Sequence, residues 1–283
     1  MPGASKVWLI TGSSRGLGRA FAEAALAAGD RVVATARDPG RLQELIARYP
    51  EHCVALPLDV THRDAVFQCI EKGIAAFGQL DVVVNNAGYG LVGTIEEHSE
   101  ADLRAQMETN LFGALWMTQA VLPHLRARRT GHIVQISSVG GVGSMPTFGA
   151  YNASKWALEG FSEALAAEVA PWGIRVTLVE PGSFATDWSW GSMRFAAPMP
   201  AYDELRTSLF GTSQVPWDLS HQAHDTSASP EVAARELLEH VNRETGPLRL
   251  LLGEDAPVQV RTLLDGRRED YLRNPRFQAL VAR

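Results

Sequence analysis

The stretch Thr11-Gly12-Ser13-Ser14-Arg15-Gly16-Leu17-Gly18 follows directly on the apolar run Val7-Trp8-Leu9-Ile10. Glycines between a strand and a helix let the backbone turn tightly and bring its amides close to a phosphate group. The positive end of the following helix favours the charge of a pyrophosphate. The pattern alone also fits a plain strand-to-helix connection, and the preceding strand favours dinucleotide binding. We predict contacts to a dinucleotide from Gly12, Ser14, Arg15, Gly16, Leu17 and Gly18.

Short apolar runs alternate with longer helix-like segments along most of the chain. Most runs are rich in Val, Ile and Leu throughout, which is typical of parallel strands buried on both faces. Right-handed βα units of this kind build a doubly wound, mostly parallel α/β Rossmann sheet with helices on both faces. We predict seven strands, at Val7–Ile10, Arg31–Ala36, Cys53–Leu58, Leu80–Asn85, His132–Ser137, Arg175–Glu180 and Leu248–Leu252.

Helix signals lie between these strands. Thr61–Asp64 and Ser99–Asp102 each fit a capping box, and Ser229-Pro230 places a cap before a proline in a first turn. Gly29 is expected to end the first helix. Helices are therefore expected in the segments between the predicted strands.

We expect residues 1–283 to form a single Rossmann-type domain, because 46% hydrophobic residues can bury one sizeable core. Two segments interrupt the alternation of strands and helices. The segment at about 186–225 holds aromatic residues and prolines without a strand signal, which predicts a binding loop with its own short helices rather than a second domain. The segment at about 255–283 is charged and is expected to form a helical C-terminal extension.

Composition excludes several classes of partner. The net charge of −6, without a run of basic residues, gives no electrostatic reason to expect nucleic acid. Cys53 and Cys69 have no C-x-x-C spacing, so we expect no disulfide framework and a reducing compartment. The first apolar run leads straight into the glycine turn, and no stretch is long enough to span a membrane. A cytoplasmic location is expected.

A metal site is not expected either. His221 and His224 would offer two ligands one helical turn apart, but the sequence shows no third ligand. Surface histidines are the simpler interpretation of this pair.

The end of the second predicted strand bears on the choice of nicotinamide coenzyme. A carboxylate there would bind a ribose hydroxyl, whereas an arginine would bind a 2'-phosphate. The strand ends in Arg37, and Arg15 of the glycine turn would converge on the same phosphate. Asp38 lies 20 residues after Gly18, near the spacing of a ribose-binding carboxylate, but Asp38-Pro39-Gly40 also fits a turn. We favour NADP(H).

Three residues in the middle of the chain are suited to moving a proton. Tyr151 and Lys155 are four residues apart in a helix-like stretch, so their side chains are neighbours. A free tyrosine has a pKa of about 10, and Lys155 together with an oxidised nicotinamide ring is expected to lower it. Ser138 follows a predicted strand at the sheet edge where ligands bind, and its hydroxyl would hold the substrate oxygen. A Tyr-x-x-x-Lys pair alone also fits a helix surface, but the combination favours general acid–base chemistry.

With these residues the chain resembles the short-chain dehydrogenase/reductase family, over nearly the whole region up to about Leu252. The step of 13 residues from Ser138 to Tyr151 is typical of that family. Its pattern is matched by Thr11-Gly12-x-x-x-Gly16-x-Gly18, Asp59-Val60, Asn85-Asn86-Ala87-Gly88, Asn110, Ser138, Tyr151-x-x-x-Lys155 and Pro181-Gly182.

The resemblance implies a role for further residues. It implies that Asp59 contacts the adenine and that Lys155 also holds the nicotinamide ribose. Pro181-Gly182 and Thr186 would place the nicotinamide carboxamide, and the positions of Arg15 and Arg37 are similar to those of NADP-preferring members. The remaining coenzyme contacts expected from it are Val60, Asn86, Ala87, Gly88, Tyr151 and Phe184.

The resemblance also assigns Asn110, which would position a water molecule that relays protons through Lys155. A helix residue bonded to nearby backbone is the alternative. The surrounding Glu108-Thr109-Asn110-Leu111-Phe112-Gly113 fits the family pattern and favours catalysis. The catalytic group is then Asn110, Ser138, Tyr151 and Lys155.

The segment after Thr186 forms the substrate lid in that family. It is rich in large apolar side chains, which favours a bulky, apolar carbonyl or alcohol bound by Ser138, Tyr151, Trp188, Trp190 and Met193. Packing of the lid onto the body or onto a second subunit explains these side chains equally well. The large apolar side chains of this segment are Trp188, Trp190, Met193, Phe195, Met199, Tyr202 and Phe210.

The chain also resembles the branch of the family that contains 17β-hydroxysteroid and retinol dehydrogenases, whose members act on many substrates. The family usually pairs its helices around Asn110 and Tyr151 across a two-fold axis, which implies a homodimer or homotetramer. Trp116, Trp156 and Phe161 would serve that contact or face the sheet.

Hydride transfer between NADP(H) and a carbonyl or secondary alcohol is the leading interpretation. A regulator that binds NADP(H) without turnover is one alternative, although the intact Ser138, Tyr151 and Lys155 argue against it. An epimerase or dehydratase, which uses the coenzyme only transiently, is another.

Overall fold

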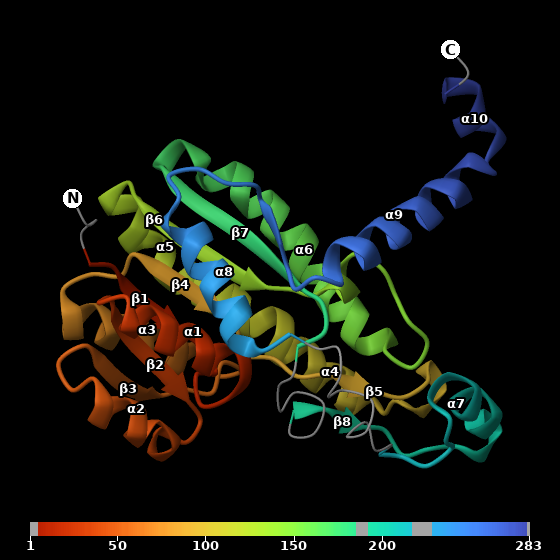
Figure 1. Ribbon diagram of the computed structural model, residues 1–283, viewed down its shortest axis with the longest axis horizontal. Helices are drawn as coiled ribbons and strands as arrows, with labels where there is room; N and C mark the ends of the chain where they lie inside the picture. The colour runs from red at the N-terminus through yellow and green to blue at the C-terminus, as the bar shows by residue number, and fades with distance from the viewer. Residues whose placement is uncertain (1–4, 185–191, 217–227, 282–283) are drawn as a thin grey trace.

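The computed structural model describes residues 5–184, 192–216 and 228–281. Its centre is a seven-stranded sheet in the order β3-β2-β1-β4-β6-β7-β9, with parallel pairing throughout (Figure 1). The doubly wound parallel sheet predicted from the apolar runs is confirmed, with end points that shift by at most two residues. The strands are β1 (Val7–Ile10), β2 (Arg31–Ala36), β3 (Cys53–Pro57), β4 (Val82–Asn85), β6 (Gly131–Ile136), β7 (Ile174–Pro181) and β9 (Arg249–Leu252).

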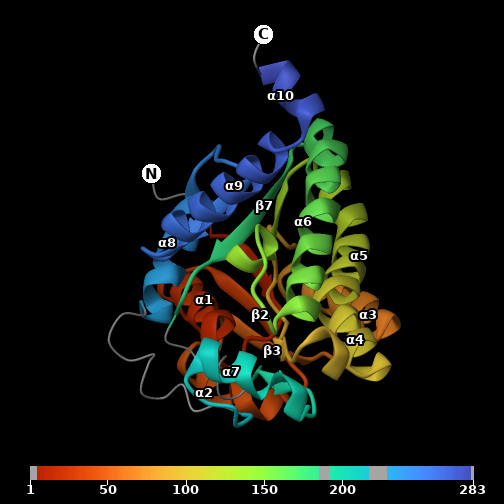
Figure 2. The same cartoon turned by 90° about the vertical axis from the view of Figure 1, so that its right-hand side faces the viewer.

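Helices cover both faces of the sheet (Figure 2). Successive strand side chains point to opposite faces, so Trp8 and Ile10 join one buried cluster while Val7 and Leu9 join the other. The first cluster includes side chains of α1 (Gly16–Ala27), α2 (Gln43–Arg48) and α8 (Pro230–Asn242). The second includes side chains of α3 (Arg63–Phe77), α5 (Gly113–Arg128) and α6 (Gly149–Val169). Two apolar cores therefore hold the strands rigidly between helices.

Two of the helix signals in the sequence have the expected structural role, and a third has it in part. Gly29 follows the end of α1 with a φ of 86°, a left-handed conformation that favours glycine. The Ser99 hydroxyl accepts a hydrogen bond from the Asp102 amide (3.1 Å) and caps α4 (Glu100–Met107). Pro230 is the first residue of α8, although the hydroxyl of Ser229 forms no cap hydrogen bond.

The capping box predicted at Thr61 is wrong. Helix α3 begins at Arg63, and its N-cap residue is His62, whose side chain does not cap the helix. The Thr61 hydroxyl donates to Asp59 Oδ1 (2.8 Å), which also accepts from the Thr61 amide (3.0 Å). Because the helix begins two residues after Thr61, this side chain belongs to the loop at Asp59 and not to the helix start.

A second, two-stranded sheet was not predicted. It pairs β5 (Leu91–Val92) with β8 (Arg194–Phe195), and α7 (Asp203–Phe210) follows it (Figure 1). Strands of two residues are too short to show a period of hydrophobicity. The small sheet attaches the described part of the predicted lid to the loop that follows β4.

Helices α9 (Ala256–Leu272) and α10 (Pro275–Val281) extend away from the sheet (Figures 1 and 2). The guanidinium of Arg267 lies 4.5 Å from the ring centroid of Trp156, which is 44% exposed. Trp116 and Phe161 instead pack partly against the core that includes α3, α5 and α6. Within the described ranges, no helix combines the length and apolar character needed to cross a bilayer. Subunit contacts through these rings stay a prediction.

Candidate active site

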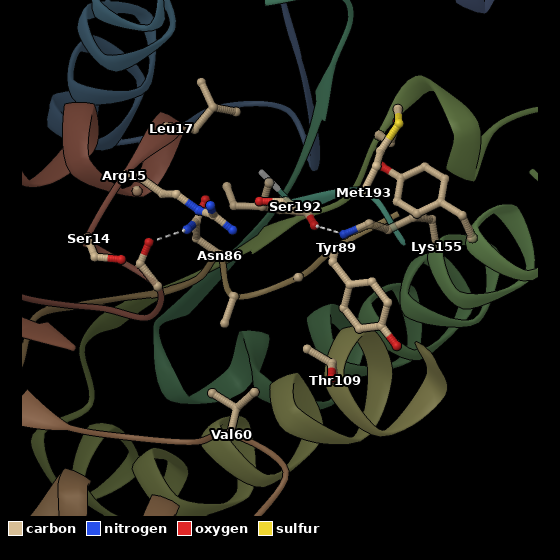
Figure 3. Close-up of a pocket in the computed structure, with 18 of the residues that line it drawn as sticks. Ser14, Arg15, Leu17, Val60, Asn86, Tyr89, Thr109, Lys155, Ser192 and Met193 are labelled. Atoms are coloured by element: carbon tan, nitrogen blue, oxygen red, sulfur yellow. Dashed lines mark hydrogen bonds between the residues drawn. The ribbon is translucent and has the colours of Figure 1, made fainter. Parts of the chain in front are cut away.

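A cavity of about 980 Å³ opens at the carboxyl ends of the parallel strands. The strand order reverses between β1 and β4, and the loops after these two strands form its floor. Ligands bind at such reversal points in doubly wound sheets, and the volume suits a large organic molecule. Figure 3 shows Ser14 and Arg15 at one end of the cavity, Lys155 and Met193 at the other, and Asn86 between them.

The cavity brings together most of the residues that the sequence singled out. Asn110 lies just behind the wall, and Thr186, Trp188, Trp190, His221 and His224 lie outside the described residues. The predicted residues that line the cavity are Gly12, Ser14, Arg15, Gly16, Leu17, Gly18, Arg37, Asp59, Val60, Asn86, Ala87, Gly88, Ser138, Tyr151, Lys155, Pro181, Gly182, Phe184 and Met193.

The glycine turn has a geometry that favours glycine at position 12 and leaves no room for a side chain at position 18. Gly12 has a φ of 69°, and a Cβ atom at Gly18 would collide with the Gly12 carbonyl and with Asn86 Nδ2. The Asn86 amide in turn donates to the Thr11 carbonyl oxygen (2.9 Å) and ties this turn to the loop after β4. The turn and the β4 loop therefore form one surface.

The start of helix α1 is open to a ligand. Among the described residues no side chain caps this helix, whose N-cap residue is Arg15. The first amides of a helix have no partners within the helix and favour an anion. Because the same residues line the cavity, the site fits the pyrophosphate of a dinucleotide.

Arg15, Arg37 and Asp38 are the residues that bear on the choice between NAD and NADP. Arg15 and Arg37 both line the cavity, at the end where β1 and β2 finish. Asp38 accepts a hydrogen bond from the Gly40 amide (2.9 Å) and belongs to the turn that begins the next short helix. Of the two interpretations of Asp38, the structure favours the turn.

Ser138, Tyr151 and Lys155 meet at the opposite end of the cavity. Ser138 follows β6, and helix α6 carries Tyr151 and Lys155 on neighbouring turns. The buried Lys155 Nζ donates to the Ile136 carbonyl oxygen (2.7 Å) and lies 5.8 Å from the centroid of the Tyr151 ring. Ser138 Oγ accepts from the Gly140 amide (3.0 Å), which fixes its orientation.

Burial shifts the pKa values of both ionisable groups. It raises the pKa of Tyr151 to about 12, although the hydrogen bond with Ser138 acts in the opposite direction. It lowers the pKa of Lys155 to about 8, against the attraction of the Glu159 carboxylate. In the protein without coenzyme, the phenol form of Tyr151 is therefore favoured at neutral pH. The contribution expected from an oxidised nicotinamide ring stays a prediction.

Asn110 is buried in a π-helical turn, Glu108–Phe112, between α4 and α5. Its amide donates to the Tyr89 carbonyl (3.0 Å) and to Ser154 Oγ (3.1 Å), and its oxygen accepts from the Tyr89 amide (3.1 Å). A Cβ atom at Gly88 would lie 3.1 Å from Asn110 Oδ1 and 3.7 Å from Lys155 Nζ. Asn110 and Lys155 thus converge behind Gly88, and π-turns are frequent at functional sites.

Comparison with known proteins agrees with this geometry. The family model described as short chain dehydrogenase matches residues 6–194. The chain belongs to the short-chain dehydrogenase/reductase family. It is 42% identical over 253 residues to an oxidoreductase of Botryotinia fuckeliana, BOA17, covering 89% of this chain and 90% of that one. It is 36% identical over 259 residues to bovine (Bos taurus) retinol dehydrogenase 8, covering 88% and 82%.

Solved structures of the family superpose well on this chain. A short-chain dehydrogenase from Streptomyces avermitilis is 40% identical, with a TM-score of 0.88 over 99% of this chain and 100% of that one. A short-chain dehydrogenase from Burkholderia cenocepacia was solved with NADP (25% identity, TM-score 0.73, covering 95% and 97%). One from Burkholderia phymatum was solved with NAD (24% identity, TM-score 0.77, covering 91% and 92%). Family membership makes the protein an oxidoreductase and leaves the choice of coenzyme to its own residues.

Among the cavity-lining residues of this family member that the sequence had not singled out, Tyr89 and Arg194 form a pair of side chains. The guanidinium of Arg194 lies 4.6 Å from the centroid of the Tyr89 ring, next to Met193. Tyr89 directly follows the Asn86-Ala87-Gly88 motif, and that position was the one signal in the sequence. Arg194 depends on the pairing of β8 with β5, which the sequence did not indicate.

Apolar side chains surround Tyr151. Met193, Phe195 and Phe210 of the predicted lid pack around a small core of Val92 and Phe148, as Tyr151 itself does. Met199 and Tyr202 are instead held through hydrogen bonds by Glu97 and Glu96. The aromatic residues of the lid therefore divide between the site and the attachment of the lid to the body.

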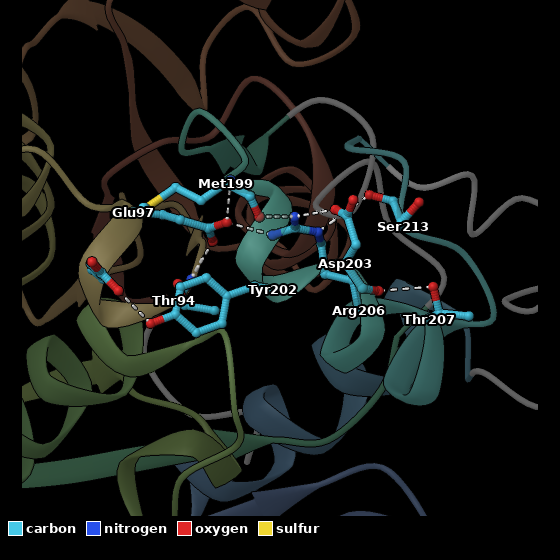
Figure 4. Close-up of polar contacts among 9 residues, drawn as sticks. Thr94, Glu97, Met199, Tyr202, Asp203, Arg206, Thr207 and Ser213 are labelled. Atoms are coloured by element: carbon cyan, nitrogen blue, oxygen red, sulfur yellow. Dashed lines mark hydrogen bonds and ion pairs between the residues drawn. The ribbon is translucent and has the colours of Figure 1, made fainter.

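A buried ion pair attaches the lid (Figure 4). The side chains of Arg206 and Glu97 are each 2% exposed and form a hydrogen-bonded pair. Arg206 also donates to the Met199 carbonyl (2.7 Å) and to Asp203 Oδ1 (2.7 Å). Glu97 accepts from the backbone amides of Thr94 (2.8 Å) and Met199 (2.7 Å). The pair thus connects α7 and β8 to the loop after β5.

Replacement of Arg206 by Met is expected to lower the free energy of unfolding by about 3 kcal/mol, because Glu97 would stay buried without its partner. Urea unfolding measures this change. The control is the double variant Glu97→Leu/Arg206→Leu, in which no charge is left buried and most of the stability is expected to return. Equal losses in the single and double variants would contradict the account.

Proposed function

We propose that this protein transfers a hydride between NADP(H) and the carbonyl or secondary alcohol of a bulky, apolar substrate. The observation that carries the proposal is the meeting of Ser138, Tyr151 and Lys155 in the cavity that the glycine turn also lines. When bound, the coenzyme would supply or accept the hydride. Gly12 and Gly16 would let the turn approach its pyrophosphate, with the open start of α1 supplying amides.

In the direction of reduction, Tyr151 gives its hydroxyl proton to the oxygen of the substrate carbonyl. Ser138 holds the same oxygen through its hydroxyl. Lys155 holds the nicotinamide ribose and favours the tyrosinate that forms, because its ammonium lies next to the ring. Asn110 keeps Tyr89 and the wall at Gly88 in place and would position a water molecule that relays protons through Lys155.

Arg15 and Arg37 support the choice of NADP(H). Both side chains line the cavity end expected to hold the adenosine, whereas Asp38 is engaged by its own turn. A guanidinium binds a phosphate through paired hydrogen bonds. Asp59 and Val60 line the same end and would contact the adenine.

Replacement of Arg37 by Asp is expected to weaken NADP⁺ binding relative to NAD⁺ by about 10- to 100-fold, the loss of a charge-assisted hydrogen bond. Titration of both coenzymes, followed by tryptophan fluorescence, measures the ratio of the dissociation constants. Arg41→Asp makes the same change of charge on a nearby exposed residue and is expected to leave the ratio unchanged. An unchanged ratio in Arg37→Asp would reject the 2'-phosphate contact.

The apolar surroundings of Tyr151 support a bulky substrate. Met193 lines the cavity beside the group formed by Phe148, Phe195 and Phe210. Trp188, Trp190 and Thr186 are proposed to complete the lid and the nicotinamide site. A panel of ketones and aldehydes of increasing size, followed at the NADPH absorbance, tests this preference. Larger apolar carbonyls are expected to have the lower KM, and release of NADP⁺ in bulk excludes a sensor or an epimerase.

A further inference from the structure

Four ionisable residues follow one another along helix α6 at steps of one turn. They are Tyr151, Lys155, Glu159 and Glu163, and residues four apart on a helix are neighbours. Tyr151 and Lys155 lie in the cavity, Glu159 is 7% exposed, and the side chain of Glu163 is 54% exposed. The helix therefore carries a line of ionisable side chains from the cavity to solvent.

A second buried carboxyl group lies beside this line. Glu180, the residue before the cavity-lining Pro181, has no exposed surface. One guanidinium, that of Arg249, contacts three carboxylates: Nε lies 3.0 Å from Glu180 Oε1, and an Nη atom lies 3.1 Å from Glu159 Oε2 and is hydrogen-bonded to Glu163. Two buried negative charges and an exposed one against a single positive charge are unfavourable. Two such carboxyl groups are stabilised when they share a proton.

The cluster is continuous with the active site. Lys155 Nζ is bonded to the Ile136 carbonyl, and the next residue, Ser137, has its hydroxyl buried beside Glu159. A Cβ atom at Gly141 would lie 2.6 Å from Ser137 Oγ and 3.3 Å from Glu159 Oε1. Only a glycine at position 141 leaves room for this approach.

We propose that Glu159 and Glu180 hold a proton behind Lys155 and pass it between Lys155 and solvent at Glu163. In the direction of reduction, Tyr151 loses its O–H proton to the substrate and regains one from the Lys155 ammonium, whose N–H bond breaks as the tyrosine O–H bond forms again. The Glu159 carboxyl then breaks its O–H bond as a new N–H bond forms on neutral Lys155. The Glu180 carboxyl then gives its proton to Glu159. A proton from solvent returns to the Glu159–Glu180 pair by way of Glu163, and no group is oxidised or reduced.

The pKa values of Glu180, Glu159 and Lys155 suit this proton transfer. Burial raises the pKa of Glu180 to about 7, and the neighbouring Glu159 carboxylate adds to the effect, whereas Arg249 opposes it. Burial also raises the pKa of Glu159, and it lowers that of Lys155 to about 8. Groups of similar pKa pass a proton in either direction at small cost. The charged groups described around Glu159 are Lys155 and Glu163 on α6, Glu180 on β7 and Arg249 on β9.

The first test needs neither substrate nor coenzyme, so its result does not depend on the proposed function. Infrared spectra of the coenzyme-free protein at neutral pH are expected to show the carbonyl band of a protonated carboxylic acid. The band is expected to disappear in Glu159→Gln or Glu180→Gln and to persist in the control Glu168→Gln, an exposed residue of the same helix. Absence of the band from the unmodified protein would overturn the proposal.

The second test separates the first turnover from later ones and rests on the proposed reductase activity. In Glu159→Gln, the first turnover in a stopped-flow experiment is expected to stay within about twofold of normal, because Tyr151 begins protonated. The steady-state kcat is expected to fall about tenfold, and imidazolium buffer should restore it in proportion to its concentration. A merely structural role would slow both phases alike and would not respond to buffer. Equal slowing of both phases without a response to buffer, or an unchanged kcat, would overturn the proposal. Inactivity of the unmodified protein would instead contradict the proposed function.

Discussion

Replacement of Tyr151 by Phe is expected to lower kcat by about 10²- to 10⁴-fold, the usual contribution of a positioned acid or base. The change removes one hydroxyl group from a ring that stays packed against Phe148, at a ring distance of 6.3 Å. Because burial keeps the pKa of Tyr151 at about 12, the hydroxyl holds its proton at neutral pH in the protein alone and is ready to act as an acid.

Coenzyme binding is expected to survive this replacement, because the residues of the glycine turn lie at the other end of the cavity. Steady-state kinetics and a coenzyme titration on the same preparation separate the two effects. The matched control is Tyr49→Phe, which removes a hydroxyl group outside the cavity and is expected to leave kcat unchanged. Full activity of Tyr151→Phe would remove this residue from the mechanism.

The second large effect concerns pH. Burial lowers the pKa of Lys155 from 10.5 to about 8, so its ammonium form prevails below pH 8 and is lost above it. The proposed role of Lys155 requires the ammonium, which favours the tyrosinate. The kcat/KM for reduction is therefore expected to be level below about pH 8 and to fall about tenfold per pH unit above it, as one proton is lost.

A pH profile of the unmodified protein beside Lys155→Arg measures this effect. Arginine keeps its charge, so the fall near pH 8 is expected to disappear even though the overall rate is lower. Glu159→Gln removes an attraction that raises the pKa of Lys155, and the fall is then expected at lower pH. A fall that stays near pH 8 in Lys155→Arg would assign it to another group.

Much of the sheet could be predicted because its signals are local. Val7–Ile10 is apolar throughout and Arg31–Ala36 is mostly apolar, as is typical of buried parallel strands, and glycines mark the turn at Gly12. Ser138 and Tyr151 could be placed together because their strand and helix ends lie at one edge of such a sheet.

The contacts that the sequence did not indicate depend on residues far apart in the chain. Arg206 and Glu97 are separated by more than 100 positions, and neither has a neighbour that signals burial of its charge. The grouping of Glu159, Glu180 and Arg249 likewise arises only when β7, β9 and α6 come together. The capping prediction at Thr61 was wrong because its spacing to Asp64 fits a cap, whereas in the structure its hydroxyl is hydrogen-bonded to Asp59 in the preceding loop.

The most direct measurement for the central claim uses NADPH that carries deuterium at the transferable position, incubated with a panel of apolar ketones and aldehydes. Mass spectrometry of the products then follows the label. We expect one deuterium atom on the former carbonyl carbon of the alcohol, in proportion to the NADP⁺ formed, and none with Tyr151→Phe. Tight binding of NADPH without transfer of deuterium to any carbonyl in the panel would contradict the account.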